Sequence, residues 1–239
     1  VNGASANTQS LTLNSGTSGT ISVSGAIGGA TSLATLTVAN SGGTTFGSNV
    51  TTGTSIVLTN SSAATLITFN GNLSTPTLSV IGSANAYNVR FIGASNSITN
   101  AVTFGNTGTL VLGDAATDGF TFSGGVTATA PSSITLAGTF TSGAAWSVGD
   151  GNTGITLAAN TTITTSTANA NLTLGGALTG ASYTLTLSAG TATISFGSTA
   201  SGLGNTSLTA NEISLSGNFG GSGTLSIVPA TLSRDIYLS

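Results

Sequence analysis

Residues 56 to 91 of this chain read IVLTNSSAATLITFNGNLSTPTLSVIGSANAYNVRF, and this stretch predicts the fold. It contains four short strings of apolar and polar residues, centred at equal intervals on Val57, Thr68, Ser79 and Arg90. Alternation with a period of two places successive side chains on opposite faces of a strand. The stretch therefore predicts a series of short strands, each with an apolar face turned inward and a polar face turned outward.

The same pattern recurs along the 239-residue chain. A motif of apolar, Ser or Thr, apolar, any, small, any and apolar residues occurs six times, at residues 21–27, 67–73, 120–126, 134–140, 172–178 and 213–219. Further strings lie between these copies, so that strand centres fall roughly every 10 to 12 residues, as in all-β proteins. We expect an all-β fold built from internal repeats.

Two all-β architectures are open, a β-solenoid and a β-sandwich. Short turns throughout, 5% aromatic residues and 3% charged residues favour the solenoid, because a sandwich usually has larger aromatics and a more charged surface. Two strands per coil of about 22 residues would give about 11 coils and a rod of about 50 Å. Three strands per coil would give a shorter and thicker rod. We expect residues 1–239 to form a single elongated β-repeat domain.

The composition excludes several classes of function. Seven residues are charged, and the chain has no His, Cys, Met or Lys, so most acid–base, thiol and imidazole–metal chemistry is excluded and no cofactor is expected. With Arg90 and Arg234 as its two basic residues, the chain is not expected to bind nucleic acid. No apolar run reaches the length of about 18 residues that a transmembrane helix needs. Because the chain starts at Val1, we expect a processed chain or a fragment of a larger protein.

Three strings carry a resemblance to a known group of proteins: GGATSLATLTV at residues 28–38, GTTFG at 43–47 and LAANTTI at 157–163. They resemble the β-strand repeats of bacterial surface proteins, the filamentous-haemagglutinin-like exoproteins and autotransporter passenger segments. The resemblance implies a right-handed parallel β-helix outside the cell that serves adhesion, aggregation or surface coating. It assigns no binding residue to this chain.

The acidic residues are the candidates for a metal or catalytic site. Asp114 and Asp118 lie in one short segment next to Gly113 and Gly119, and Asp150 precedes Gly151. Paired carboxylates bind Ca²⁺ or cleave glycosides in other proteins. Asp next to Gly is, however, first a turn-forming residue. We therefore expect turns at these positions, with Asp114, Asp118 and Asp150 as weak calcium candidates, and no enzyme.

Threonine and aromatic residues give two further hypotheses. Thr139 and Thr141, Thr162 and Thr164, and Thr184 and Thr186 recur at nearly equal intervals, which predicts a short outward Thr ladder like those of ice-binding solenoids. The pattern fades on either side, which favours an ordinary strand surface. The nine Phe residues are expected in the core, whereas the single Trp and the three Tyr residues could lie in the core or contact sugars.

The ends of the chain suggest self-assembly. Neither terminus carries an amphipathic capping helix, so we expect either further chain or stacking on neighbouring copies. Ile236, Tyr237 and Leu238 form a short candidate donor strand for a neighbour's sheet. We expect a non-enzymatic extracellular or cell-surface structural protein, a subunit or segment of a fibre, filament or sheath. The alternatives are an adhesin that binds a surface or glycan, a polysaccharide-active enzyme and an ice-binding protein.

Overall fold

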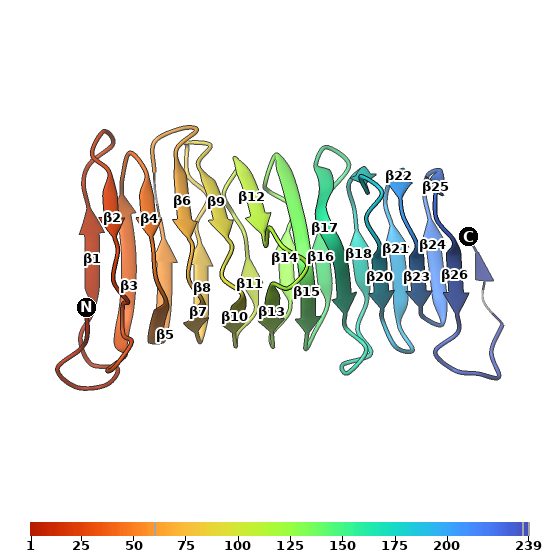
Figure 1. The fold of residues 1–239 in the computed structure, drawn as a ribbon, viewed down its shortest axis with the longest axis horizontal. Helices are drawn as coiled ribbons and strands as arrows, with labels where there is room; N and C mark the ends of the chain where they lie inside the picture. The colour runs from red at the N-terminus through yellow and green to blue at the C-terminus, as the bar shows by residue number, and fades with distance from the viewer. Residues whose placement is uncertain (60, 236, 239) are drawn as a thin grey trace.

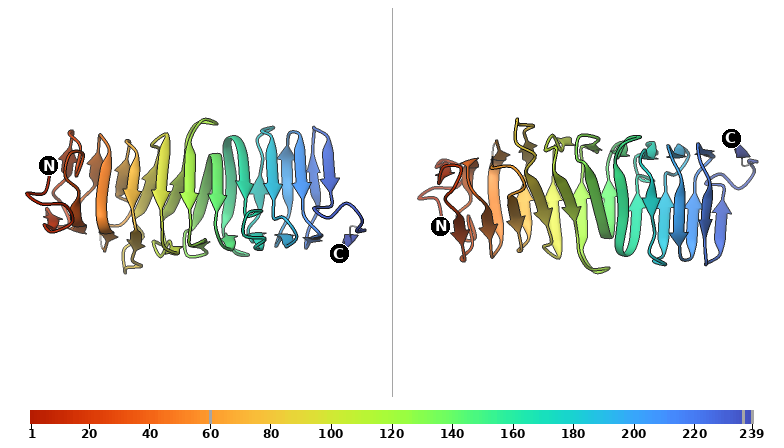
Figure 2. Two further views of the ribbon diagram at one scale, coloured as in Figure 1. Left: turned by 90° about the horizontal axis from the view of Figure 1, so that it is seen from below. Right: turned by 90° about the horizontal axis from the view of Figure 1, so that it is seen from above.

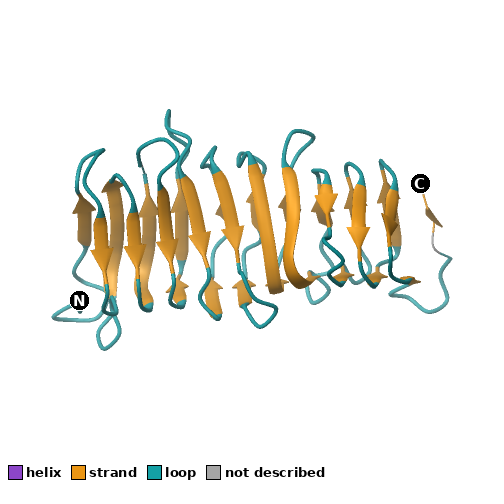
Figure 3. Cartoon of the chain, turned by 45° about the horizontal axis from the view of Figure 1, so that its top comes forward, coloured by secondary structure: helices purple, strands orange, loops and turns teal. Residues whose placement is uncertain are grey.

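The computed structural model describes residues 1–59, 61–235 and 237–238, and this part of the chain forms 27 β-strands and no helix. Figures 1 and 3 show that the strands follow one another along a rod from the N-terminus to the C-terminus. Strands inside the rod pair in parallel with the strand one coil before and the strand one coil after, as Ile67 does with Thr44 and Val89. Strands of the terminal coils, such as β1 (Leu11–Asn14) and β26 (Leu225–Val228), pair on one side. The chain is a parallel β-solenoid, which confirms the prediction and excludes the sandwich.

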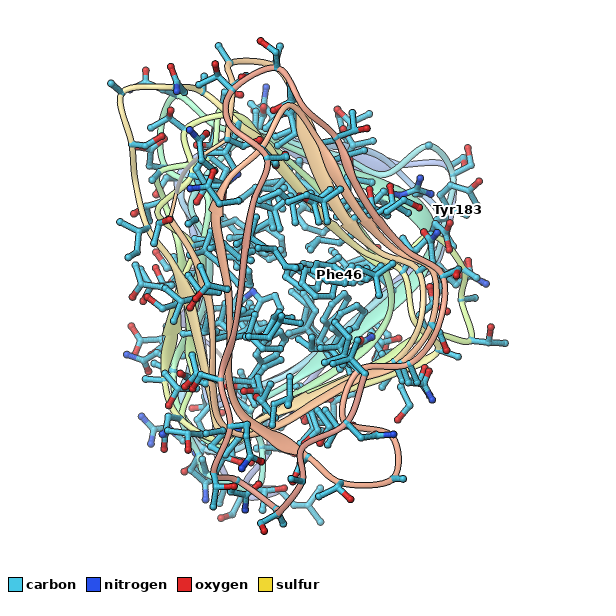
Figure 4. The ribbon with its side chains drawn as sticks, turned by 90° about the vertical axis from the view of Figure 1, so that its left-hand side faces the viewer. Phe46 and Tyr183 are labelled. Carbon is cyan, nitrogen blue, oxygen red and sulfur yellow. The ribbon has the colours of Figure 1, made fainter. Side chains whose placement is uncertain are left out.

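The solenoid has three faces, and the end-on view in Figure 4 shows its roughly triangular outline. Strands β3, β5, β15 and β17 bend around a corner, so that each contributes to two faces. Their bounds are β3 (Leu33–Asn40), β5 (Val50–Leu58), β15 (Ser133–Ser142) and β17 (Gly154–Thr164). The number of strands per coil, which the sequence leaves open, is therefore three.

Face 1 contains parts of β3 and β5 with β1 (Leu11–Asn14), β8 (Thr77–Val80), β11 (Val102–Thr103), β14 (Val126–Ala128), β16 (Trp146–Val148), β18 (Leu172–Leu174), β21 (Thr193–Phe196), β24 (Glu212–Leu215) and β27 (Tyr237–Leu238). Face 2 contains parts of β15 and β17 with β2 (Ile21–Val23), β4 (Thr44–Phe46), β6 (Leu66–Phe69), β9 (Asn88–Phe91), β12 (Thr109–Leu112), β19 (Leu178–Thr179), β22 (Ala200–Leu203) and β25 (Phe219–Gly221).

Face 3 contains the remaining parts of β3, β5, β15 and β17 with β7 (Leu73–Thr75), β10 (Ser95–Ile98), β13 (Gly119–Phe122), β20 (Leu185–Ser188), β23 (Thr206–Thr209) and β26 (Leu225–Val228). Face 2 has one strand from each of ten coils, which stack to a rod about 48 Å long at about 4.8 Å per coil. The coils differ in length, from a short one between Ala200 and Phe219 to a long one between Leu11 and Leu36.

The core consists of columns in which equivalent residues of successive coils lie one above another. On face 3, Phe120, Phe140, Ile163, Leu187 and Leu208 are consecutive partners and all are buried. Stacking the same side chain position on itself buries the apolar face of every coil, which no single coil could do alone. Figure 2 shows the same regular spacing of coils from two further sides.

Glycine permits the sharp corner within β15. Gly138 has a φ of +99°, and the pairing register of β15 shifts between Leu136 and Gly138. A Cβ at this position would collide with the carbonyl oxygen of Asp118 in the neighbouring coil. Only glycine therefore allows the strand to turn here from face 2 to face 3.

Within the described residues, no helix has the length and apolarity that a membrane crossing requires.

Candidate functional site

Asp114 and Asp118 lie in the turn between β12 and β13, and both carboxylates already have protein partners. Asp118 is 4% exposed, and its Oδ2 accepts hydrogen bonds from the backbone N–H groups of Asp114 at 2.9 Å and Ala115 at 3.1 Å. Asp114 forms a 2.8 Å ion pair with Arg90 of β9 on the surface. Such a surface pair contributes at most about 1 kcal/mol to stability. Asp118 therefore stabilises the turn itself, and Asp114 connects the turn to the preceding coil.

Asp150 lies in a different turn, between β16 and β17. Its Oδ1 accepts a hydrogen bond from the backbone N–H of Asn152 at 2.9 Å and one from the Thr153 hydroxyl at 2.9 Å. The N–H of Asn152, followed by the Thr153 hydroxyl, lowers the pKa of Asp150. This corner joins faces 1 and 2, whereas Asp114 and Asp118 occupy a corner between faces 2 and 3. In the described part of the chain, no group of three or more His, Cys, Asp or Glu residues could hold a metal ion.

The aromatic side chains lie mainly in the core. Phe69 stacks between Phe46 and Phe91, with ring centroids 4.6 Å and 4.9 Å apart, which confirms the prediction for these residues. Trp146 and Tyr87, which the sequence leaves undecided, are also fully buried. Figure 4 shows Phe46 inside the rod and Tyr183 at its surface.

A glycan-binding adhesin predicts a local patch of exposed aromatic rings, but the described side chains include no such patch. Tyr183 is 36% exposed and lies at the corner before β20, away from the stacked rings of the core. The side chain of Tyr237 lies outside the described set.

The outward surface of face 3 carries the most regular set of polar groups in the described structure. A first row has a hydroxyl side chain in eight successive coils: Thr51, Ser74, Ser97, Thr121, Thr141, Thr164, Ser188 and Thr209. A second row, two positions earlier in each strand, has hydroxyl side chains in five successive coils: Thr139, Thr162, Thr186, Ser207 and Ser226. We call these thirteen residues the hydroxyl array.

The predicted Thr ladder is therefore present but longer than expected, and one part of the prediction is wrong. Thr139 and Thr141 pair with Thr162 and Thr164 as predicted. Thr162 then pairs with Thr186, not Thr184, because the loop before β20 lengthens this coil. Thr184 lies outside the strand. Sequence spacing alone hides the array because coils of unequal length separate its members.

Shallow hollows lie on the surface of the described residues, and two of them are candidate binding sites. One, of about 340 Å³, lies over β2, β4 and β6 and is lined by residues that include Thr20, Ser22, Gly43, Leu66 and Thr68. The other, of about 210 Å³, lies near the C-terminal end between β22, β25 and β26. Neither lining contains a charged residue, so neither holds the acid–base groups of a hydrolase.

The terminal coils leave parts of the core columns uncovered. Leu225 in β26 is 45% exposed, whereas Leu185, at the same position two coils earlier, is fully buried. The backbone of Tyr237 and Leu238 pairs with Glu212 and Ile213 of the same chain. Ile236, the first residue of the predicted donor strand, lies outside the described residues.

Comparison with protein-family models, curated proteins and solved structures finds no match to this chain.

Proposed function

We propose that this chain is a non-enzymatic structural segment of an extracellular fibre, filament or sheath at a cell surface. The observation that carries the proposal is the continuity of the core columns. They run through ten coils and, at β26, stop with Leu225 half-exposed and the strand edge unpaired among the described residues. A further coil would bury these groups, whether it belongs to the same chain or to a neighbouring copy.

The polar chemistry of the chain supports a structural role. The carboxylates of Asp118 and Asp150 accept hydrogen bonds within their own turns, and that of Asp114 pairs with Arg90. These charged groups therefore stabilise the corners of the solenoid. The resemblance to bacterial surface repeats agrees with this role, and the proposal assigns no residue to catalysis. The implied partner is another solenoid coil joined end to end.

Cryo-electron microscopy of the purified chain tests the proposal. We expect rods that join end to end as the protein concentration rises, with an axial repeat of about 50 Å for ten coils at about 4.8 Å each. A variant with Leu225→Lys and Val228→Lys places charge on the exposed end of face 3, where both side chains are at least 40% exposed. It should form fewer end-to-end contacts while its circular dichroism spectrum stays that of a β-protein.

The control variant is Thr127→Lys, which places the same charge on an exposed side chain in the middle of face 1. It should join end to end as the unmodified chain does. Rods that stay separate at every concentration would contradict joining between copies. Joined rods that are unaffected by the two end substitutions would contradict the proposed contact.

A further inference from the structure

We propose that the hydroxyl array on face 3 is an ice-binding surface, which recognises the ordered outer layer of water molecules on an ice crystal. The inference does not depend on the fibre proposed above, because it concerns one lateral face of the rod. It rests on three properties of the array: its two-dimensional regularity, its free hydroxyl groups and its lack of charge.

The array is regular in two directions. Neighbouring coils place equivalent hydroxyl groups about 4.8 Å apart along the rod, and the two rows are separated by two strand positions, or about 6.6 Å. Both rows are complete from β15 through β23, where Thr139 and Thr141 begin the run and Ser207 and Thr209 end it. A face of an ice crystal is likewise an array of hydrogen-bonding oxygens that is periodic in two dimensions, with repeats of this order. Many weak hydrogen bonds between the array and the ice surface can then form together, because the array does not have to be ordered separately for each of them.

The hydroxyl groups of the array are free to bind water. Of its thirteen members, only Thr164 has a hydroxyl hydrogen bond to another described side chain, that of Ser166 at 2.8 Å. Thr141, Thr162 and Thr186, for example, point outward from strands whose backbones pair on both sides. A threonine side chain has few χ1 rotamers, so its hydroxyl and methyl groups occupy defined positions. The surface is therefore ordered before it meets a ligand.

Charge distinguishes face 3 from the other two faces. Face 1 has Glu212 in β24, and face 2 has Arg90 in β9, but the described strands of face 3 contain no charged residue. The rows of face 1 are less complete: Thr35, Ser55 and Thr77 form a short second row, but Val57 interrupts the row beside it. Near the other end of face 1, Glu212 follows Thr193. A charged side chain orders the water molecules around itself, and their arrangement differs from that of the water molecules in ice. Among the described strands, face 3 alone presents an uncharged double row of hydroxyls that is complete over four successive coils.

A crystalline polysaccharide is the other periodic ligand that such a face could meet. The flat apolar faces of sugar rings are usually bound by exposed aromatic side chains. The described residues of the array include none, and Trp146, the single tryptophan, is buried. The observations therefore favour ice.

The test measures thermal hysteresis and the inhibition of ice recrystallisation by the folded chain. The unmodified protein should depress the freezing temperature below the melting temperature and keep ice grains small. Thr141→Tyr, in the middle of the first row, should reduce both effects several-fold because the large ring interrupts the flat array. Thr121→Tyr, one coil earlier in the same row, provides a second variant if the first does not fold.

The matched control is Thr127→Tyr, a threonine in the middle of face 1 that is exposed as Thr141 is. It should leave both effects unchanged, and circular dichroism and the melting temperature should show that all variants are folded. The proposal is overturned if the folded, unmodified chain has no effect on ice. It is overturned equally if Thr127→Tyr removes as much activity as the face 3 variants, or if binding to cellulose or chitin particles, but not to ice, depends on Thr141.

Discussion

Asn96 shows how one residue can join three coils. It occupies an inward position of face 3 between Leu73 and Phe120, where the column is otherwise apolar, and it is 2% exposed. Its Oδ1 accepts a hydrogen bond from the N–H of Leu73 at 3.1 Å, and its Nδ2 donates to the carbonyl of Gly93 at 2.6 Å. A longer contact of 3.4 Å reaches the carbonyl of Gly119. The buried amide is thus satisfied from three successive coils.

Replacement of this side chain should be costly. Asn96→Ala leaves the N–H of Leu73 and the carbonyl of Gly93 buried without partners, and each such group costs about 1 to 3 kcal/mol. We expect a loss of roughly 2 to 4 kcal/mol in the free energy of unfolding, measured by urea denaturation. The control, Asn100→Ala, removes an exposed hydrogen bond to Thr77 and should cost under about 0.5 kcal/mol. Equal losses in the two variants would contradict the role of Asn96.

Tyr87 makes the free energy of unfolding depend on pH in the alkaline range. Burial raises the pKa of Tyr87 from 10.0 to about 12, and its hydroxyl donates a 2.6 Å hydrogen bond to the carbonyl of Ile81. The folded state keeps the phenol proton more tightly than the unfolded state, so this contribution to stability is full below pH 10 and is lost as pH rises through about 12. The loss should be about 3 kcal/mol, since each pKa unit corresponds to about 1.4 kcal/mol.

Urea unfolding at pH values from 10 to about 12 would measure this loss. In Tyr87→Phe, which has no titrating hydroxyl, stability at neutral pH should be lower because the carbonyl of Ile81 loses its donor. The decline over the same pH range should then be much shallower. An equally steep decline in the variant would show that another group is responsible.

At the scale of elements, the sequence predicts the longer strands well and the short ones poorly. The strings centred on Val57, Thr68, Ser79 and Arg90 correspond to strands β5, β6, β8 and β9. Strands such as β11 and β19 have two residues each, which is too short for a period of two to be recognised. The third strand of each coil is therefore visible only once pairing with its neighbours is known.

The same limit applies to the candidate sites. Asp118 and Asp150 could be assigned to turns because an Asp next to Gly stabilises a turn locally. Only the middle of the hydroxyl array, around Thr141 and Thr164, could be predicted from sequence spacing. The rest could not, because it depends on which residues pair between coils of different length. The step from Thr139 to its partner Thr162 is longer than the step from Thr186 to its partner Ser207. The additional residues lie in the corners between strands, where no strong sequence pattern marks them.

The stacked phenylalanines connect consecutive strands of face 2. Phe69 of β6 has a ring on either side, Phe46 of β4 and Phe91 of β9, and all three are buried. Phe69→Ala should cost about 3 to 5 kcal/mol, because a core cavity replaces the ring and two stacking contacts are lost. Phe219→Ala is the control, since Phe219 of β25 is half-buried and contacts one ring, Phe196. We expect a clearly smaller loss there in urea unfolding, and equal losses would contradict the column as the source of stability.

At the scale of the whole molecule, the solenoid is close to one-dimensional. A coil contacts mainly the coils before and after it, so its stability is expected to be a sum of coil terms and interface terms. The coil-to-coil steps of face 2 connect one strand to the next without interruption, from Ile21 to Phe219. Such a molecule can gain or lose a complete coil without a change of architecture.

Deletion of residues 140–162 tests this property. Phe140 and Ile163 occupy the same position in successive coils, so the deletion joins Thr139 to Ile163 and removes one coil in register. We expect a folded protein, shorter by about 4.8 Å in small-angle X-ray scattering and somewhat less stable. Deletion of residues 140–150 alone should prevent folding, because it shifts later strands out of phase with their faces. Failure of the full-coil deletion to fold would show that the coils are not equivalent units.

The direction of the hydrogen bonds between coils has a mechanical consequence. These bonds run along the rod, so tension on its two ends acts on the outermost rung first, and the rungs open in turn instead of resisting together. Each coil that detaches adds about 20 residues of extended chain, or roughly 70 Å. A material made of such rods would lengthen in steps under load and dissipate energy before its covalent backbone is stretched.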